Sequence, residues 1–93
     1  MIYAVFKADI KRPEAMASYR EKAGAALARH GGKVEQATPS PSALDGSPTL
    51  SDAAAVLSFP DKDAAQAWIN DPELADLHDL RRSAGRTEIL LLG

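Results

Sequence analysis

The first third of the chain shows two different periodicities of hydrophobic residues, one after the other. Between Ile2 and Ile10 apolar residues occupy every second position, and a period of two predicts a strand. From about residue 13 to residue 30 the apolar positions recur at spacings of mostly three and four, which predicts a helix that opens at Pro13. We expect Gly31 and Gly32 to end this helix, because glycine adopts a left-handed C-cap without steric cost.

Two short apolar segments flank a region rich in turn-forming residues. Lys33 to Thr38 is interpreted as a short strand, and Ala53 to Phe59 is a compact apolar run of strand length closed by Pro60. Proline, serine, aspartate and glycine dominate the region between them, residues 38–52. This composition predicts an exposed, irregular loop.

The last third predicts a helix that is interrupted once and then a final strand. Asp61 can cap a helix whose apolar positions include Trp68, and Asn70 to Glu73 supply a new cap, a first-turn proline and a first-turn acid. A kinked helix or a pair of helices follows, and we expect Gly85 to end it. Thr87 to Leu92 is predicted to be a strand that is apolar on both faces.

The order β-α-β-β-α-β predicts an α+β fold of the ferredoxin-like type, with helices on one face of a four-stranded antiparallel sheet. We expect residues 1–93 to form one such domain. Two helices cover only one face of the sheet, yet the other face carries Tyr3, Val5, Leu90 and Leu92. Leaving such side chains in water forgoes about 1.5–3 kcal/mol each. We therefore predict a symmetric homodimer in which two sheets pack face to face into an α+β barrel.

Composition and charge narrow the choice of partners. The chain has 93 residues, 18 of them alanine, and no cysteine, so neither a disulfide framework nor a thiolate metal site is available. The two histidines are too few and too far apart to define a metal site, so we expect no metal. We also expect no cofactor. The formal net charge is -2 and the charges are interspersed, which predicts no nucleic-acid partner and no membrane partner. An initial segment without signal-peptide features leads us to expect a cytoplasmic protein.

Several short motifs together resemble a known family. They are Pro13-Glu14, His30-Gly31-Gly32, Leu44-Asp45-Gly46, Ser58-Phe59-Pro60, Ala65 with Trp68, Asp71-Pro72-Glu73-Leu74, Leu80-Arg81 and Leu90-Leu91-Leu92-Gly93. In order and spacing they resemble the domain of unknown function 1330 family over nearly the whole chain. The resemblance implies a ferredoxin-like fold that dimerises into an α+β barrel, and it implies no established activity.

The candidate catalytic residues are the two histidines. His30 lies at the predicted end of the first helix, where the helix dipole favours a cation, and either acts as a general base or only contacts the last carbonyl groups. His78 shares one helical side with Arg81 and Arg82, a cluster that could hold a carboxylate or phosphate. The alternative is a solvated face, because Glu73, Asp76 and Asp79 lie close enough in sequence to neutralise it.

The predicted ligand-binding residues are Lys7, Tyr19, His30, Trp68 and Arg81. Tyr19 and Trp68 also fit as core aromatics, and Lys7 fits either a solvated strand end or the mouth of a cavity. Our leading hypothesis is a small-molecule-binding protein that holds a small organic acid in a cleft between sheet and helices. The sequence assigns no reaction to this cleft.

Two other functions are kept as alternatives. Trp68 and His78 are similar in placement to residues of the haem-degrading and cofactor-independent monooxygenases that share this barrel fold. Those enzymes also use an asparagine on the first strand, and Ile2 to Ile10 contains none. The second alternative is a non-catalytic dimeric module for stress response or assembly, in which the apolar sheet face serves only dimerisation.

Overall fold

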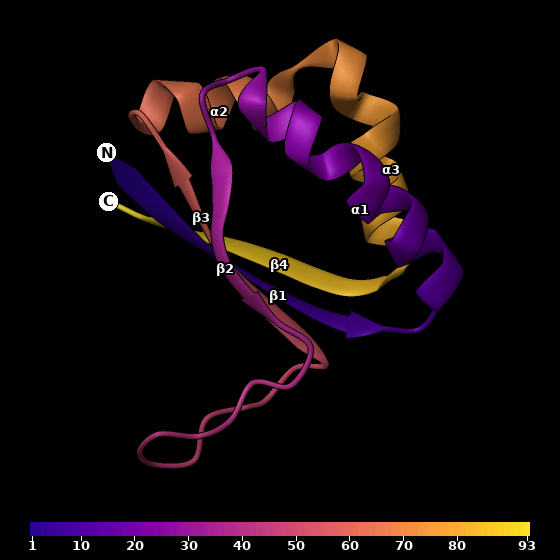
Figure 1. The fold of residues 1–93 in the computed structure, drawn as a ribbon, viewed down its shortest axis with the longest axis vertical. Coiled ribbons are helices and arrows are strands. Elements are labelled where there is room, and N and C mark those ends of the chain that lie inside the picture. Colours follow the sequence, from indigo (N-terminus) through magenta and orange to yellow (C-terminus); the bar gives the residue numbers. More distant parts are fainter.

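Four antiparallel strands form a single sheet, and the helices lie together on one side of it (Figure 1). The computed structural model describes residues 1–93. Its elements are β1 (Ile2–Ile10), α1 (Pro13–Ala28), β2 (Lys33–Thr38), β3 (Ala53–Phe59), α2 (Lys62–Asn70), the 3-10 helix η1 (Pro72–Leu74), α3 (Ala75–Ser83) and β4 (Gly85–Leu92). The strand order is β2-β3-β1-β4. The predicted ferredoxin-like α+β fold is therefore confirmed.

Side chains of the central strand β1 point alternately to the two faces of the sheet, one covered by helices and the other free of them. Ala4 and Ala8 point toward the helices and are each 1% exposed. On the other face Val5 lies opposite Val56 of β3 and Leu90 of β4. Leu90 is 64% exposed, so the helix-free face carries a row of apolar side chains in contact with water.

The core between the helices and the sheet contains two clusters. One is built around Phe59 and Trp68, whose ring centres are 5.6 Å apart, and the other around Met16 and Tyr19. Small alanines in the sheet lie under these large side chains, because an alanine leaves room for a bulky neighbour. The alanine-rich composition thus serves close packing of helices on the sheet.

Two predicted helix boundaries were wrong. The first helix ends at Ala28 rather than near residue 30, and a Schellman-type turn follows, in which Gly32 N–H donates to Leu27 O (2.8 Å). Gly31 has a φ of 72° in this turn. Gly85 does not end a helix but begins β4, where a Cβ atom would lie 1.9 Å from the carbonyl oxygen of Asp9.

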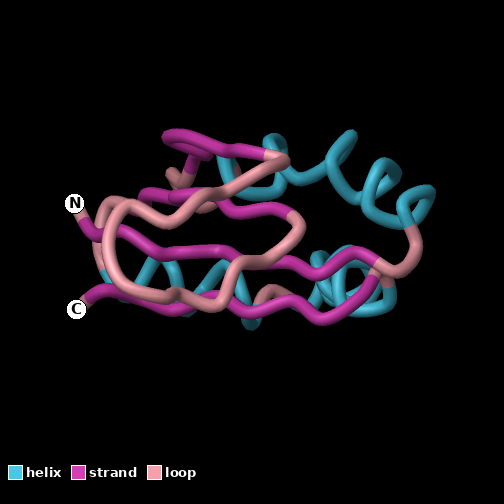
Figure 2. The backbone as a smooth tube through the Cα atoms, turned by 90° about the horizontal axis from the view of Figure 1, so that it is seen from below, coloured by secondary structure: helices cyan, strands magenta, loops and turns pink.

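The segment between β2 and β3 is an extended arm without helix or strand, residues 39–52. It projects away from the helices on the helix-free side of the sheet (Figure 1), and in the view from that side it lies in front of the strands (Figure 2). Its base is attached to β1, because Asp52 Oδ2 accepts a hydrogen bond from Ile10 N–H (2.8 Å). Leu44 near its tip is fully exposed.

None of the helices combines the length and the apolar character needed to cross a membrane.

Candidate functional site

Arg81 of α3 is a buried cation without an anionic partner. Its side chain is enclosed, and the residue is 3% exposed. The guanidinium carbon lies 5.6 Å from the ring centre of Tyr19 and 5.5 Å from that of Trp68. No carboxylate lies within ion-pair distance of it, and its Nε has no hydrogen-bond partner. Since arginine stays protonated in proteins, this site holds an uncompensated positive charge.

His78 fixes the position of this guanidinium. Its Nε2 donates to the backbone carbonyl of Trp68 (3.0 Å), so that Nδ1 is left to accept a hydrogen bond from Arg81 Nη1 (2.7 Å). Burial lowers the pKa of His78, and the charges of Arg81 and Arg82 lower it further. His78 is therefore a neutral imidazole with both ring nitrogens engaged. This arrangement suits a positioning residue better than a general acid or base.

A cavity of about 320 Å³ lies beside Arg81, between α2, α3 and the helix-covered face of the sheet. Its volume falls in the range of small-molecule sites. Most of its wall is apolar, and the lining includes Ala4, Phe59, Trp68, Ile69, Arg81, Ile89 and Leu91. The indole Nε1 of Trp68 is also buried without a hydrogen-bond partner. Two residues of the wall thus carry buried donors that no protein atom satisfies, and such donors are rare in folded proteins.

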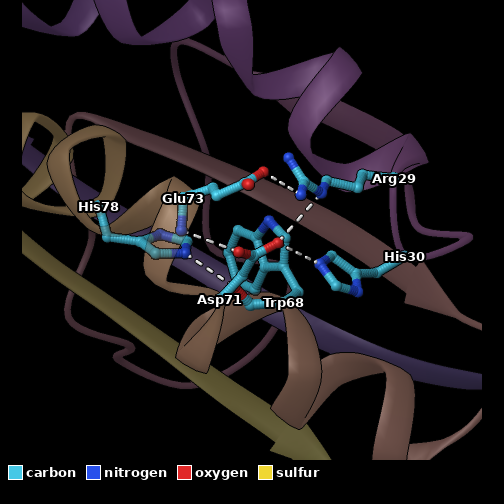
Figure 3. A network of polar contacts seen from close by, with 6 residues as sticks. All are labelled: Arg29, His30, Trp68, Asp71, Glu73 and His78. Carbon is cyan, nitrogen blue, oxygen red and sulfur yellow. Dashed lines mark hydrogen bonds and ion pairs between the residues drawn. The ribbon is translucent and has the colours of Figure 1, made fainter.

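His30 takes part in a different cluster, which joins the end of α1 to the start of η1 (Figure 3). Its Nε2 lies 2.9 Å from Asp71 Oδ2, and Asp71 also pairs with Arg29 (3.1 Å). Arg29 pairs in turn with Glu73. The hydrogen bond from His30 is the main cause that holds the pKa of Asp71 below its usual range. These contacts indicate that His30 fastens two elements together, and it does not line the cavity beside Arg81.

Lys7 lies on the helix-free face, away from Arg81. It is paired in the sheet with Glu88, and its Nζ donates to the carbonyl oxygen of Thr49 in the arm (3.0 Å). A second cavity of about 310 Å³ between the arm and the charged end of this face includes Lys7, Arg86 and Glu88 in its wall. Of the five predicted ligand-binding residues, the structure therefore groups Tyr19, Trp68 and Arg81, and it places His30 and Lys7 elsewhere. Ligand binding by the first three stays a prediction.

The predicted cluster of His78, Arg81 and Arg82 is divided between two environments. Arg82 is mostly exposed and pairs with Asp79 (3.2 Å), whereas Arg81 points inward and meets no acid. Sequence reasoning missed the sheet residues of the cavity wall, among them Phe59, Ile89 and Leu91. Their signal was present, since all three occupy the inward positions of their alternating strands.

Comparisons with known proteins agree with this architecture. A sequence model of the family described as "Domain of unknown function (DUF1330)" matches residues 1–93. No curated protein shows significant similarity to the chain. Among solved structures, a protein of unknown function from Rhodopseudomonas palustris has a TM-score of 0.80 at 21% identity, covering 98% of this chain and 79% of that one.

Two further structures share the fold at lower identity. SnoaB, a cofactor-independent oxygenase from Streptomyces nogalater, has a TM-score of 0.67 at 18% identity, with 99% of this chain and 90% of that one covered. A dimeric ferredoxin-like protein of unknown function from Jannaschia sp. CCS1 has a TM-score of 0.66 at 14% identity, with coverages of 99% and 97%. At these identities the likeness extends to the fold and not to the activity.

Proposed function

The chain belongs to the DUF1330 family, and we propose that it binds a small organic acid in the cavity beside Arg81. The carboxylate of the acid pairs with the Arg81 guanidinium, and its apolar part lies against Trp68 and Ile89. One observation carries the proposal: Arg81 is 3% exposed and has no acidic partner among the residues of the chain. A buried charge of this kind is costly unless an anion compensates it.

The properties of the cavity support a singly charged ligand. The cavity wall contains two cations, Arg81 and Arg82, and only Arg81 is buried. Arg82 is mostly exposed and paired with Asp79. The guanidinium of Arg81, a residue of the cavity wall, suits the oxygens of a carboxylate. The apolar remainder of the wall suits an uncharged body, and a dianion such as a phosphate ester would leave one charge unpaired.

The contacts of His78 favour binding over oxygen chemistry. SnoaB is a cofactor-independent oxygenase of the same fold, and this likeness keeps an oxygenase as the second candidate. An acid-base role for His78 would require a free ring nitrogen, and both nitrogens are engaged with Trp68 and Arg81. These contacts support a role for His78 in positioning Arg81 for a bound acid.

We also propose that the protein is a homodimer formed through the helix-free face of the sheet. Tyr3, Val56, Leu90 and Leu92 of this face are exposed, as expected for a surface that packs against a second copy. The Jannaschia protein, which has the same fold, is dimeric. The cavity beside Arg81 lies on the opposite, helix-covered side, so each copy would carry a complete site of its own.

Thermal unfolding with benzoate, and with the uncharged benzamide as the matched probe, tests the proposed binding. At about 100 times its Kd a ligand stabilises the folded state by about 2.7 kcal/mol, which corresponds to a rise in Tm of about 10 °C or more in a small domain. We expect benzoate and not benzamide to raise Tm. Arg81→Met should lower the benzoate affinity by about tenfold or more, because it removes charge-assisted hydrogen bonds.

The control for this test is Arg86→Met. Arg86 lies on the helix-free face and is highly exposed, so its replacement should leave benzoate binding unchanged. If no carboxylate of comparable size raises Tm, or if Arg81→Met binds benzoate as the unaltered protein does, the proposal fails. A protein that remains dimeric but binds no acid would support the non-catalytic dimeric module instead.

A further inference from the structure

A third cavity, of about 390 Å³, lies under α1 on the helix-covered side of the sheet. Twelve of its fifteen lining residues are apolar, among them Phe6, Met16, Leu27 and Val34. Alanines widen it on both sides, with Ala23 on α1 and Ala37 on β2. Such a wall gives water few hydrogen-bond partners, so that a hydrocarbon group replaces the water favourably.

This apolar cavity adjoins the cavity beside Arg81. Ile89 of β4 lines both of them. The Arg81 guanidinium is in contact with the rings of Tyr19 and Trp68, and Tyr19 lines the apolar cavity whereas Trp68 lines the other. Arg81 lines the first cavity, and the Tyr19 ring that its guanidinium contacts lines the apolar one, so one aromatic ring lies between the charge and the apolar cavity.

We propose that the two cavities together form one elongated site for a monocarboxylic acid with a linear hydrocarbon chain. The carboxylate pairs with Arg81 and the chain passes over Ile89 into the apolar cavity under α1. This inference rests on the proposed binding of an acid at Arg81, and it adds the chemical class of that acid. Charge complementarity selects the head group, and the apolar wall selects the tail.

Calorimetric titration with butanoate, hexanoate, octanoate and decanoate, each below its micellar concentration, tests the inference. Moving one methylene group from water into an apolar environment contributes about three- to fourfold in affinity. We expect the affinity to rise by up to this factor per methylene along the series, until the cavity under α1 is full. Arg81→Met should weaken the binding of every member of the series.

Variants that fill the apolar cavity test where the hydrocarbon chain of the acid lies. Ala23→Phe places a ring in the apolar cavity. It should lower octanoate affinity about tenfold or more, because the ring excludes about two to four methylene groups of the ligand from the cavity. Butanoate affinity should be unchanged. The matched control is Ala17→Phe, because Ala17 is exposed on the same helix and lies outside the cavity wall. Ala37→Phe fills the same cavity from the sheet side and serves as the second variant if Ala23→Phe does not fold.

The outcomes distinguish this inference from the proposed function. Equal affinities along the series would overturn the inference and leave acid binding at Arg81 intact. An absence of binding by any member, together with a failure of benzoate, would overturn both. A chain-length dependence that persists in Ala23→Phe and Ala37→Phe, or an octanoate affinity that is unchanged in Arg81→Met, would place the chain or the carboxylate elsewhere and would also overturn it.

Discussion

The three side chains that the Arg81 guanidinium contacts are neutral, and this determines how the residue behaves. His78 accepts its hydrogen bond, and Tyr19 and Trp68 offer only the faces of their rings. Aromatic faces attract a cation but do not neutralise it. The guanidinium is thus held in place and remains available to an anion.

The stability of the folded protein should depend on pH through His78. Its pKa is lowered in the folded state from an ordinary value of 6.5, so the unfolded chain binds a proton more readily. The free energy of unfolding should therefore fall as the pH is lowered through 6.5 toward the folded-state pKa, and the contribution should be fully present above 6.5. Protonation would also place a second cation against Arg81.

Urea denaturation at pH 7.5 and at pH 5.5 measures this effect. The unaltered protein should lose more stability between the two pH values than His78→Gln does, because glutamine does not titrate. The difference between the two proteins isolates His78 from the other titrating groups. Equal losses in both proteins would contradict the assignment of His78 as a buried neutral imidazole.

Two sets of polar contacts between elements help to position α1 and α3 on the sheet. In the first, Asp71 links the end of α1 to η1 through His30 and Arg29. In the second, Ala84 O accepts hydrogen bonds from Lys11 N–H (2.8 Å) and Arg12 N–H (2.9 Å), which ties the end of α3 to the connection before α1. Both sets of contacts connect segments that are distant in the sequence, and they hold α1 beside η1 and α3.

Asp71→Ala should lower Tm by several degrees. The change removes the partner of His30 and Arg29 and also the carboxylate oxygen that accepts the N–H of Glu73 (2.9 Å). The control is Asp79→Ala, which removes one exposed ion pair with Arg82 and should change Tm by little. Equal Tm values for the two variants would show that the cluster around Asp71 contributes no more than a surface pair.

The stabilising form of Asp71 is its carboxylate, because its pKa is lowered in the folded state. Its contribution is fully present above the ordinary value of 3.8 and is lost as the pH falls below 3.8 through the folded-state pKa. Acid unfolding of the unaltered protein should therefore have a steeper pH dependence in this range than that of Asp71→Ala. Coincident acid-unfolding profiles would contradict this.

Gly85 and Gly24 should respond in opposite ways to alanine. A Cβ at Gly85 would lie 1.9 Å from Asp9 O, at a φ of 157°, so Gly85→Ala should destabilise the protein by more than about 2 kcal/mol. Gly24 lies within α1, and nothing occupies the space around its Cβ position. Gly24→Ala should stabilise the protein by about 0.5–1 kcal/mol. Urea denaturation of both variants decides whether the close approach of β1 and β4 requires the glycine.

The two faces of the sheet differ in what covers them. The helix-covered face encloses Arg81 and the adjoining cavities, whereas the helix-free face exposes apolar side chains and carries the arm. A chain of 9.9 kDa buries a modest fraction of its surface. Association through the helix-free face would add buried area without closing the cavities on the other side.

Leu90→Asp should convert the proposed dimer into a monomer. Leu90 lies opposite Val5 in the middle of the exposed apolar row, and a buried unpaired carboxylate there is costly. Light scattering on a size-exclusion column should give about twice 9.9 kDa for the unaltered protein and 9.9 kDa for the variant. Ala17→Asp on the exposed side of α1 is the control and should remain dimeric. A mass of 9.9 kDa for the unaltered protein at micromolar concentration would refute the dimer.

Local patterns determined the order of the elements and the faces of the strands. The alternation in β1 predicted that Lys7 shares a face with Tyr3 and Val5, and the structure places all three on the helix-free face. Placing Lys7 in one set with Tyr19 and Arg81 disregarded that alternation. The end of α1 was predicted two residues late, because the turn at Gly31 carries its hydrogen bonds one turn beyond the last helical residue.

The sequence by itself determined the fold class, because periodicity and capping are properties of neighbouring residues in the chain. Its short motifs, in their order and spacing, also resembled the family whose model matches the chain. The sequence placed His78 and Arg81 on one helical side, which is also a local relation. Only the tertiary structure decided that Arg81 has no carboxylate within ion-pair distance and that its cavity shares Ile89 with a second, apolar one. Those facts depend on distances between α1, α3 and β4. The packing of side chains from distant parts of the chain sets these distances, and no local pattern encodes them.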